Sequence, residues 1–296
     1  MISFRHHLLS VVAVFVALAV GVILGGGPLS ELGRTDDATE PARQTDDGSA
    51  THAEYGDAFA ETVGPQLYGD RLEGQQVSLL TLAGADPATV DGVVAQVEAA
   101  GGSVAARYEG REKLTVPGEQ GYVDSLGTQL VEDNDLGDAI PSDLGSHERV
   151  GRLIGRAIAS TEENGEESDV TSQAILDTLS SGELLTAPEE QAGRTPLVLV
   201  VLGEERTDAA ATALLAGLAQ GIGSAAVGEV VVGTTTSGED GDLSLLRGED
   251  VSGFTTVDGA DTTVGQVTAA IALGAAVEGV LGSFGTSGAD GAAPVG

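Results

Sequence analysis

Residues 197–202, LVLVVL, carry the strongest strand signal in this chain. The run consists only of Leu and Val, so it offers no polar side chain to a solvent-exposed face. A strand of this kind is typical of the centre of a parallel sheet, where helices cover both faces. We therefore expect the fold to be organised around residues 197–202.

Strand and helix patterns alternate on both sides of this segment. Further strands are predicted at residues 76–82, 103–108, 229–234 and 254–257. Helices are predicted at residues 87–100, 122–131, 148–160, 170–179, 208–220 and 262–279. A strand, a helix and a strand at this spacing form a unit whose strands pair in parallel. We therefore predict an α/β domain over residues 53–284, with a Rossmann or flavodoxin-like parallel sheet and helices on both faces.

Less regular segments flank the predicted domain. Residues 28–52 combine Pro, Gly and acidic residues without apolar periodicity, which favours a flexible linker. Tyr55, Phe59 and Val63 then lie four residues apart and predict a short amphipathic helix that ends near Gly64 and Pro65. Residues 285–296 belong to a glycine-rich tail that we expect to be disordered.

Residues 8–24, LLSVVAVFVALAVGVIL, form an uncharged apolar run. No residue that is charged at neutral pH lies between His7 and Glu31, and these 23 residues would rise roughly 34 Å as a helix, enough for a hydrocarbon core of about 30 Å. We predict a transmembrane anchor at residues 8–27. A cleaved signal peptide is the first alternative, although Pro28 makes cleavage after the glycines at 25–27 unfavourable. A buried core helix is the second.

Basic residues near the ends of the run set its predicted orientation. Arg5, His6 and His7 precede the run, whereas mainly acidic residues follow it. Cytoplasmic flanks carry the excess of basic residues, so we expect residues 1–7 in the cytoplasm and the bulk of the chain outside the cell membrane.

The charge balance excludes some classes of partner. The chain has 13 Lys and Arg against 46 Asp and Glu, a formal net charge of −33, and Lys113 is its single lysine. Nucleic-acid binding needs a basic face, so we expect no nucleic-acid partner. The chain also has no cysteine, which excludes disulfides, thiolate metal sites and thiol nucleophiles.

Enzyme motifs are missing from the places where an α/β domain would hold them. The sequence contains no G-x-S-x-G motif, no P-loop lysine and no dinucleotide fingerprint after its first strand. Because ligands of open α/β sheets bind beyond the carboxyl ends of the strands, the residues of a candidate crevice are Gly84, Asp86, Gly203, Glu204, Thr234 and Thr235. The alternative is that these residues form ordinary strand-to-helix turns. We expect no catalysis and no cofactor, and an enzyme that uses the crevice is the minor hypothesis.

The opening MISFRHHLLSVVAVFVALAVGVILG resembles an actinobacterial family, the MctB-like copper transporters. The segments PQLYGDRLEGQQVSLLTLAGAD at residues 65–86 and VDGADTTVGQVTAAIAL at residues 257–273 agree with the same family. Members usually carry a coiled coil just outside the membrane. Here the corresponding region is the predicted linker, and no heptad repeat is long enough for a stable coiled coil.

The resemblance implies two roles for a membrane-anchored envelope protein. The first is copper transport and homeostasis, with copper implied by the family alone. The second is that of SteB, an anchored partner of the membrane protein SteA that controls cell separation. Either role implies a protein partner in the envelope or a homo-oligomer. The residues provide little for copper itself, because Cu(I) favours thiolate or thioether ligands and Cu(II) imidazole, whereas the chain has one Met and four His.

Overall fold

The computed structural model describes residues 46–189, 193–249 and 252–295, with side chains described from residue 50 onward. The predicted anchor at residues 8–27, its flanking residues Arg5, His6 and His7, and most of the predicted linker lie outside these ranges. Within these ranges, no helix is both long enough and apolar enough to cross a membrane.

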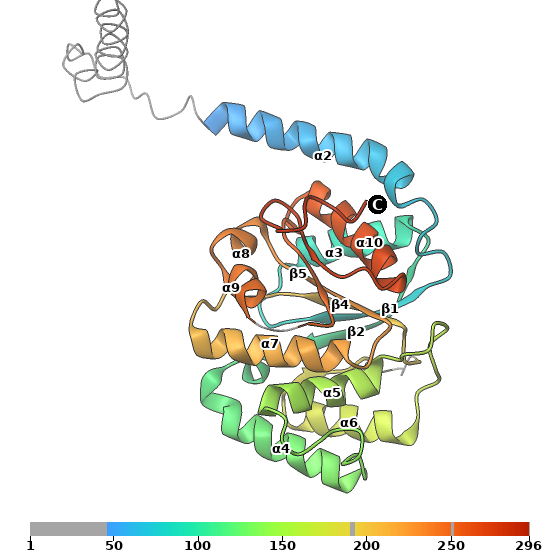
Figure 1. Cartoon of the computed structure of the whole chain (residues 1–296), viewed down its shortest axis with the longest axis vertical. Coiled ribbons are helices and arrows are strands. Elements are labelled where there is room, and N and C mark those ends of the chain that lie inside the picture. Colours follow the sequence, from blue (N-terminus) through green and yellow to red (C-terminus); the bar gives the residue numbers. More distant parts are fainter. Residues whose placement is uncertain (1–45, 190–192, 250–251, 296) are drawn as a thin grey trace, which may run out of the picture. The chain divides into compact units, whose positions relative to one another are not determined.

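A mostly parallel sheet of seven strands forms the centre of the domain (Figure 1). In sequence order the strands are β1 (Gln76–Thr81), β2 (Ser103–Gly110), β3 (Leu185–Thr186), β4 (Leu197–Val201), β5 (Gly228–Val232), β6 (Thr255–Val257) and β7 (Ser283–Phe284). Their spatial order is β3-β2-β1-β4-β5-β6-β7, and only β3 runs antiparallel to its neighbour β2. The fully buried β4 lies between β1 and β5, which confirms the expectation that residues 197–202 form a central strand.

Helices cover both faces of this sheet. The helices are α2 (Asp46–Tyr68), α3 (Pro87–Ala99), α4 (Gln120–Asp133), α5 (Ser146–Ile158), α6 (Val170–Ser181), α7 (Ala209–Gly223), α8 (Thr235–Glu239), α9 (Asp242–Gly248) and α10 (Thr263–Val277). Helices α3 and α10 lie on one face, and α5 and α7 on the other, with α4 and α6 packed outside α5 (Figure 1). Single 3₁₀ turns at Glu112–Leu114 and Pro117–Glu119 lead from β2 into α4.

Each face of the sheet has its own apolar core, because side chains of a buried strand point alternately to both faces. Leu79 and Val230 contribute to the core under α3 and α10. Leu80 and Val231 contribute to the core under α5 and α7. Two cores of Leu, Val, Ile and Ala hold the domain together without disulfides.

Helix α2 differs from the predicted short helix and from the predicted linker boundary. It begins at Asp46, inside the predicted linker, and continues through Pro65 to Tyr68. The helix is held in place by long-range contacts: Ala60 and Tyr68 are buried, and the Asp57 carboxylate accepts a hydrogen bond of 2.8 Å from the Thr263 N–H at the start of α10. These contacts outweigh the local tendency of Pro65 to end a helix.

The glycine-rich tail is also ordered, contrary to the expectation for residues 285–296. Phe284 is buried, and the backbone N–H groups of Thr286 and Ser287 donate to the Asp258 carboxylate at 2.5 and 2.9 Å. The composition of the tail indicates local flexibility, but it carries no information on a partner 29 residues away.

Candidate functional site

The predicted crevice residues all lie at the carboxyl edge of the sheet. They follow three neighbouring parallel strands: Gly84 and Asp86 follow β1, Gly203 and Glu204 follow β4, and Thr234 and Thr235 follow β5. The strand order changes direction between β1 and β4, which is where open α/β sheets hold ligands. The structure therefore brings the six predicted residues to one edge of the sheet.

The crevice itself is closed by backbone contact. The Glu204 N–H donates to the Ala83 carbonyl oxygen at 2.9 Å, so the loops after β4 and β1 touch each other. A Cβ atom at Gly203 would lie 2.0 Å from that oxygen, and one at Gly84, whose φ is +85°, would lie 2.9 Å from the Glu204 nitrogen. The hollow that remains is about 20 Å³, room for about one water molecule. The space between the loops that follow β1 and β4 is therefore small.

The polar crevice residues are engaged in helix capping. Asp86 caps α3, accepting from the Thr89 N–H at 2.8 Å and the Thr89 hydroxyl at 3.0 Å, and these hydrogen bonds lower the pKa of Asp86. Thr234 caps α8 by accepting from the Ser237 N–H at 3.1 Å. The Thr235 N–H donates to Asp261 at 2.6 Å. These are the contacts of ordinary strand-to-helix turns, the alternative left open by the sequence.

A larger hollow of about 690 Å³ lies beside the closed crevice, at the carboxyl ends of β1 and β2 and against the first turns of α3. We call it the β2 groove and define it by Gly84, Asp91, Arg107, Glu109, Arg111 and Lys113. Among these residues only Gly84 was predicted from the sequence as a site residue. A strand predicted to end at residue 108 gave no reason to place the later residues beside α3, and β2 in fact continues to Gly110.

Cations of the β2 groove are paired with carboxylates at its surface. The ion pairs are Arg107–Asp91 at 3.5 Å, Arg111–Glu109 at 4.0 Å and Lys113–Glu183 at 2.5 Å, and every member is more than 40% exposed. The hydrogen bond from Lys113 lowers the pKa of Glu183, and the same bond raises the pKa of Lys113. Exposed pairs of this kind contribute little to stability. These side chains therefore gain little from their present partners and can exchange them for other charged groups.

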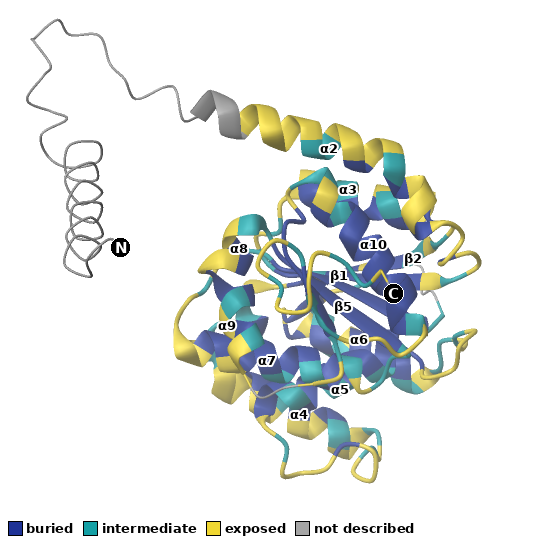
Figure 2. Ribbon diagram, turned by 45° about the horizontal axis from the view of Figure 1, so that its top comes forward, coloured by how far each residue is buried: buried dark blue, intermediate teal, exposed yellow. Residues whose placement is uncertain are grey.

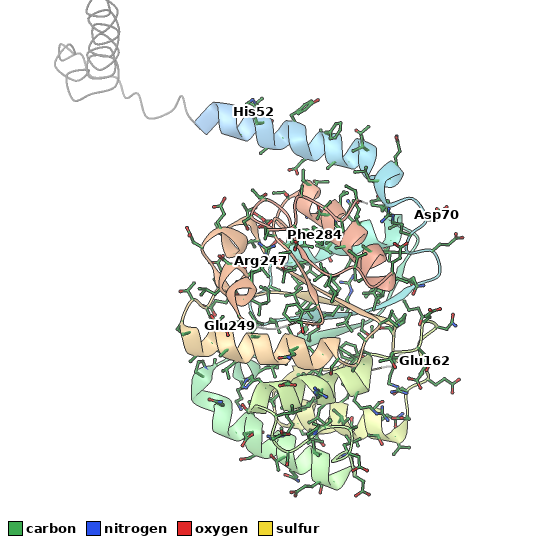
Figure 3. All side chains as sticks on the ribbon, in the orientation of Figure 1. His52, Asp70, Glu162, Arg247, Glu249 and Phe284 are labelled. Carbon is green, nitrogen blue, oxygen red and sulfur yellow. The ribbon has the colours of Figure 1, made fainter. Side chains whose placement is uncertain are left out.

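The two histidines in the described part of the chain are poor candidates for a copper site. His147 is buried, with Nε2 donating to the Leu114 carbonyl oxygen at 2.8 Å and Nδ1 3.1 Å from the Ser146 hydroxyl. Burial lowers the pKa of His147, which favours the neutral imidazole. His52 is exposed on α2 (Figure 3). Within the described ranges, no three His, Cys, Asp or Glu side chains are arranged to hold a metal ion.

Comparison with known proteins gives one consistent result. The family model described as "Copper transport outer membrane protein, MctB" matches residues 1–295. Relatives named "Copper transporter MctB" from Mycobacterium bovis and from two strains of Mycobacterium tuberculosis are each 27% identical over 318 aligned residues. These alignments cover 97% of this chain and 96% of each relative.

Proposed function

This chain belongs to the family described as "Copper transport outer membrane protein, MctB", and from that membership we propose that it takes part in copper transport at the cell envelope. We also propose that residues 8–27 anchor it in the cell membrane as a single span, with residues 1–7 in the cytoplasm. The uncharged run at residues 8–24 and the basic Arg5 before it support that topology.

In this role the α/β domain binds another molecule and does not catalyse a reaction. The observation that supports this proposal is the hydrogen bond from the Glu204 N–H to the Ala83 carbonyl oxygen, which narrows the switch point between β1 and β4, where domains of this architecture hold ligands. The accessible hollow is instead the β2 groove, and its exposed ion pairs suit a polar or charged partner.

In this proposal copper is transported and is not a resident cofactor. The chain has few side chains that can ligate copper, which is why it needs a partner. Soft thiolate and thioether ligands select Cu(I), and imidazole suits Cu(II). The sequence has no cysteine, and its single methionine is Met1. The imidazole of His147 is already engaged at both nitrogens. Adjacent imidazoles occur only at His6 and His7, beside the proposed span. The domain therefore contributes contacts with another envelope protein, and the copper path belongs to the assembly.

Copper measurements in cells test this function. Deletion of the gene should raise cellular copper and copper sensitivity, and the intact gene should restore both. A variant that combines Arg107→Ala with Arg111→Ala should fail to restore them while keeping a normal protein level and melting temperature. Unchanged copper in the deletion strain contradicts the transport role, and full restoration by the variant contradicts the role of the β2 groove.

Metal titration of the purified full-length protein separates cargo from tight ligation. We expect no sub-micromolar binding of Cu(I) or Cu(II), because the donor set lacks a copper-selective group. Sub-micromolar binding that disappears in a variant with His6→Ala and His7→Ala would move the copper site to the membrane-flanking residues.

A second candidate function is a SteB-like scaffold that binds a membrane partner and controls cell separation. The observation that favours it is the exposed aromatic pair on α2, Tyr55 and Phe59, because exposed apolar groups mark surfaces that contact other proteins. Microscopy of the deletion strain distinguishes the two functions. Chained cells with normal copper support the scaffold, and separated cells with raised copper support transport.

A further inference from the structure

Helix α2 carries a stripe of large apolar side chains that face solvent. Tyr55 is 71% exposed, Phe59 56% and Leu67 44%, and the partly buried Val63 lies between the last two. Residues four apart are neighbours on a helix surface, so each of these side chains lies next to the following one, and the stripe winds gradually round α2. Figure 2 shows that α2 is exposed along most of its length from residue 50 onward.

The stripe continues onto the neighbouring helix. Val264, in the first turn of α10, is 47% exposed and lies 3.7 Å from the position of a Cβ atom at Gly56. The rings of Tyr55 and Phe59 are stacked, with centroids 6.4 Å apart. We define the α2 patch by Tyr55, Phe59, Leu67 and Val264. Aromatic residues make up only 3% of this chain, so two of them side by side in solvent are conspicuous.

The backbone under this patch is held firmly. The opposite side of α2 is buried through Ala60 and Tyr68, and the Asp57 carboxylate binds the Thr263 N–H at 2.8 Å. A surface that is already ordered loses little conformational freedom when a partner binds. The α2 patch is therefore presented as a preformed surface.

Charge decides which kind of chain can cover the patch. Five acidic residues and no Lys or Arg occur in the sequence of α2, DDGSATHAEYGDAFAETVGPQLY. A second copy would bring the same acidic helix, with the same net charge of −33, and like charges in contact are unfavourable. Anionic lipid is disfavoured for the same reason. A basic partner is attracted by the exposed carboxylates of Glu54 and Glu61.

We propose that the α2 patch is the docking surface for a basic amphipathic helix of a partner protein. This inference deepens the partner-binding role proposed above and rests on it. An amphipathic helix laid along α2 would place its apolar side chains, one turn apart, between Tyr55, Phe59 and Val264. Its Lys and Arg residues would be attracted by Glu54 and Glu61, which are exposed on the other flank of α2, across the helix from Val264 and within a Debye length (~10 Å) of the patch. The aromatic side chains supply most of the affinity, and the carboxylates select the basic partner.

Photo-crosslinking of the full-length protein in its native cells tests the proposal. The substitution Phe59→p-benzoylphenylalanine places the reactive group inside the α2 patch. The substitution Gln129→p-benzoylphenylalanine is the control, because Gln129 is exposed on α4, which packs against α5 and not against α2. Mass spectrometry then identifies the crosslinked segment itself. We expect position 59, and not position 129, to capture a segment with net positive charge and an apolar residue every three or four positions.

Other captured segments overturn the proposal. These are a second copy of the chain, its own residues 1–45, and a segment that is acidic or lacks helical periodicity. A second crosslinking position separates failure of the α2 patch from failure of partner binding as a whole. This position is Arg111→p-benzoylphenylalanine in the β2 groove, which is measured in parallel. Capture at position 111 but not at 59 overturns the α2 patch and leaves the partner-binding function standing. No capture at either position contradicts both.

Two variants then test what holds the partner. Tyr55→Ser with Phe59→Ser should lower capture of the identified partner about tenfold or more, because buried aromatic anchors dominate helix docking. Glu54→Gln with Glu61→Gln should lower it roughly threefold, and salt should weaken capture by the parent chain more than by this variant. The melting temperature should be unchanged in both, since all four side chains are exposed. Capture that survives the serine variant overturns the α2 patch.

Discussion

Asp258 and Glu229 are both buried carboxyl groups with opposite surroundings, Glu229 on β5 and Asp258 directly after the neighbouring strand β6. Asp258 follows β6 at the carboxyl edge of the sheet, where the Arg247 guanidinium lies 3.2 Å from it and the Thr286 and Ser287 N–H groups donate to it. Glu229 is the second residue of β5, and neither of its carboxyl oxygens has a hydrogen-bond partner.

The difference shows two ways to bury an acidic group. A buried carboxylate keeps its charge only when cations and hydrogen-bond donors replace the lost water. Asp258 has both, and through them it holds the last part of the chain against the sheet. Burial instead raises the pKa of Glu229 well above 4.5, and only the nearby Gly223 backbone opposes this. Burial therefore favours the protonated, uncharged form of Glu229.

The largest expected effect is that of removing the paired carboxylate. Asp258→Ala leaves Arg247, whose side chain is 10% exposed, without its counter-ion and releases the N–H groups of residues 286 and 287. Loss of one partner of a buried ion pair costs about 3–5 kcal/mol. The free energy of unfolding should fall by that amount in urea titrations followed by circular dichroism, since the chain has no Trp.

A double variant sharpens this result. Arg247 also donates to the backbone carbonyl oxygen of Phe284 at 2.7 Å. Figure 3 labels both residues. Asp258→Ala with Arg247→Met removes the unpaired charge and should recover part of the lost stability. Equal losses in the single and double variants would show that the contacts with the tail matter and the ion pair does not.

Close packing, together with a hydrogen bond, holds the loops after β1 and β4 against each other at the same edge of the sheet. Gly203→Ala would place a Cβ atom 2.0 Å from the Ala83 carbonyl oxygen, so one loop must move. Overpacking of this kind costs about 1–3 kcal/mol. Gly121→Ala, in the first turn of α4 with no atom within 4 Å, is the matched control and should leave stability equal or slightly higher. A neutral Gly203→Ala variant would mean that the crevice opens easily.

We expect Glu229 to make the stability of the domain fall as pH rises, the opposite of the effect of a paired carboxylate. Because its folded-state pKa is raised, its stabilising proton is fully present below the unfolded pKa of about 4.5 and is lost as pH rises through the folded pKa. Glu229→Gln removes this titration. The melting temperature of the variant relative to the parent should therefore rise with pH.

The titration of His147 does not affect the difference in melting temperature between the two proteins. Burial lowers the pKa of His147, so its own contribution is lost as pH falls, and it is the same in both proteins. The difference in melting temperature between parent and Glu229→Gln isolates Glu229. A difference that stays constant from acid to alkaline pH would mean that Glu229 is already ionised and paired.

Local sequence signals predicted the fold well, because they depend on near neighbours. The apolar run at residues 197–202 became the central strand β4, and the helix predicted at residues 87–100 is α3, which begins at Pro87. The parallel pairing of β1 with β2 followed from the helix between them. These features need only the strand and helix periods and the residues that cap a helix.

The candidate site was predictable only in part, because it depends on contacts between distant segments. Parallel pairing placed Gly203 and Gly84 at one edge, but no sequence pattern indicates that the two loops touch. The β2 groove depends on where β2 ends and on how much of its face α3 leaves uncovered. The composition of residues 46–52 likewise indicated a linker, although the contact of Asp57 with Thr263, 206 residues later, helps to hold α2 in place.

The smallest expected effect comes from the exposed counterpart of the Asp258 pair. Arg107 and Asp91 lie 3.5 Å apart in the β2 groove, with side chains 54% and 73% exposed. Water solvates both charges in the absence of the contact, so Arg107→Ala should change the free energy of unfolding by no more than about 0.5 kcal/mol, measured in the same urea titration. Asp91→Ala is the matched control and should behave alike, because each removes one side of the same exposed pair. A loss as large as that of Asp258→Ala would mean that exposure does not separate structural ion pairs from exchangeable ones, and the assignment of the groove to partner binding would lose its physical basis.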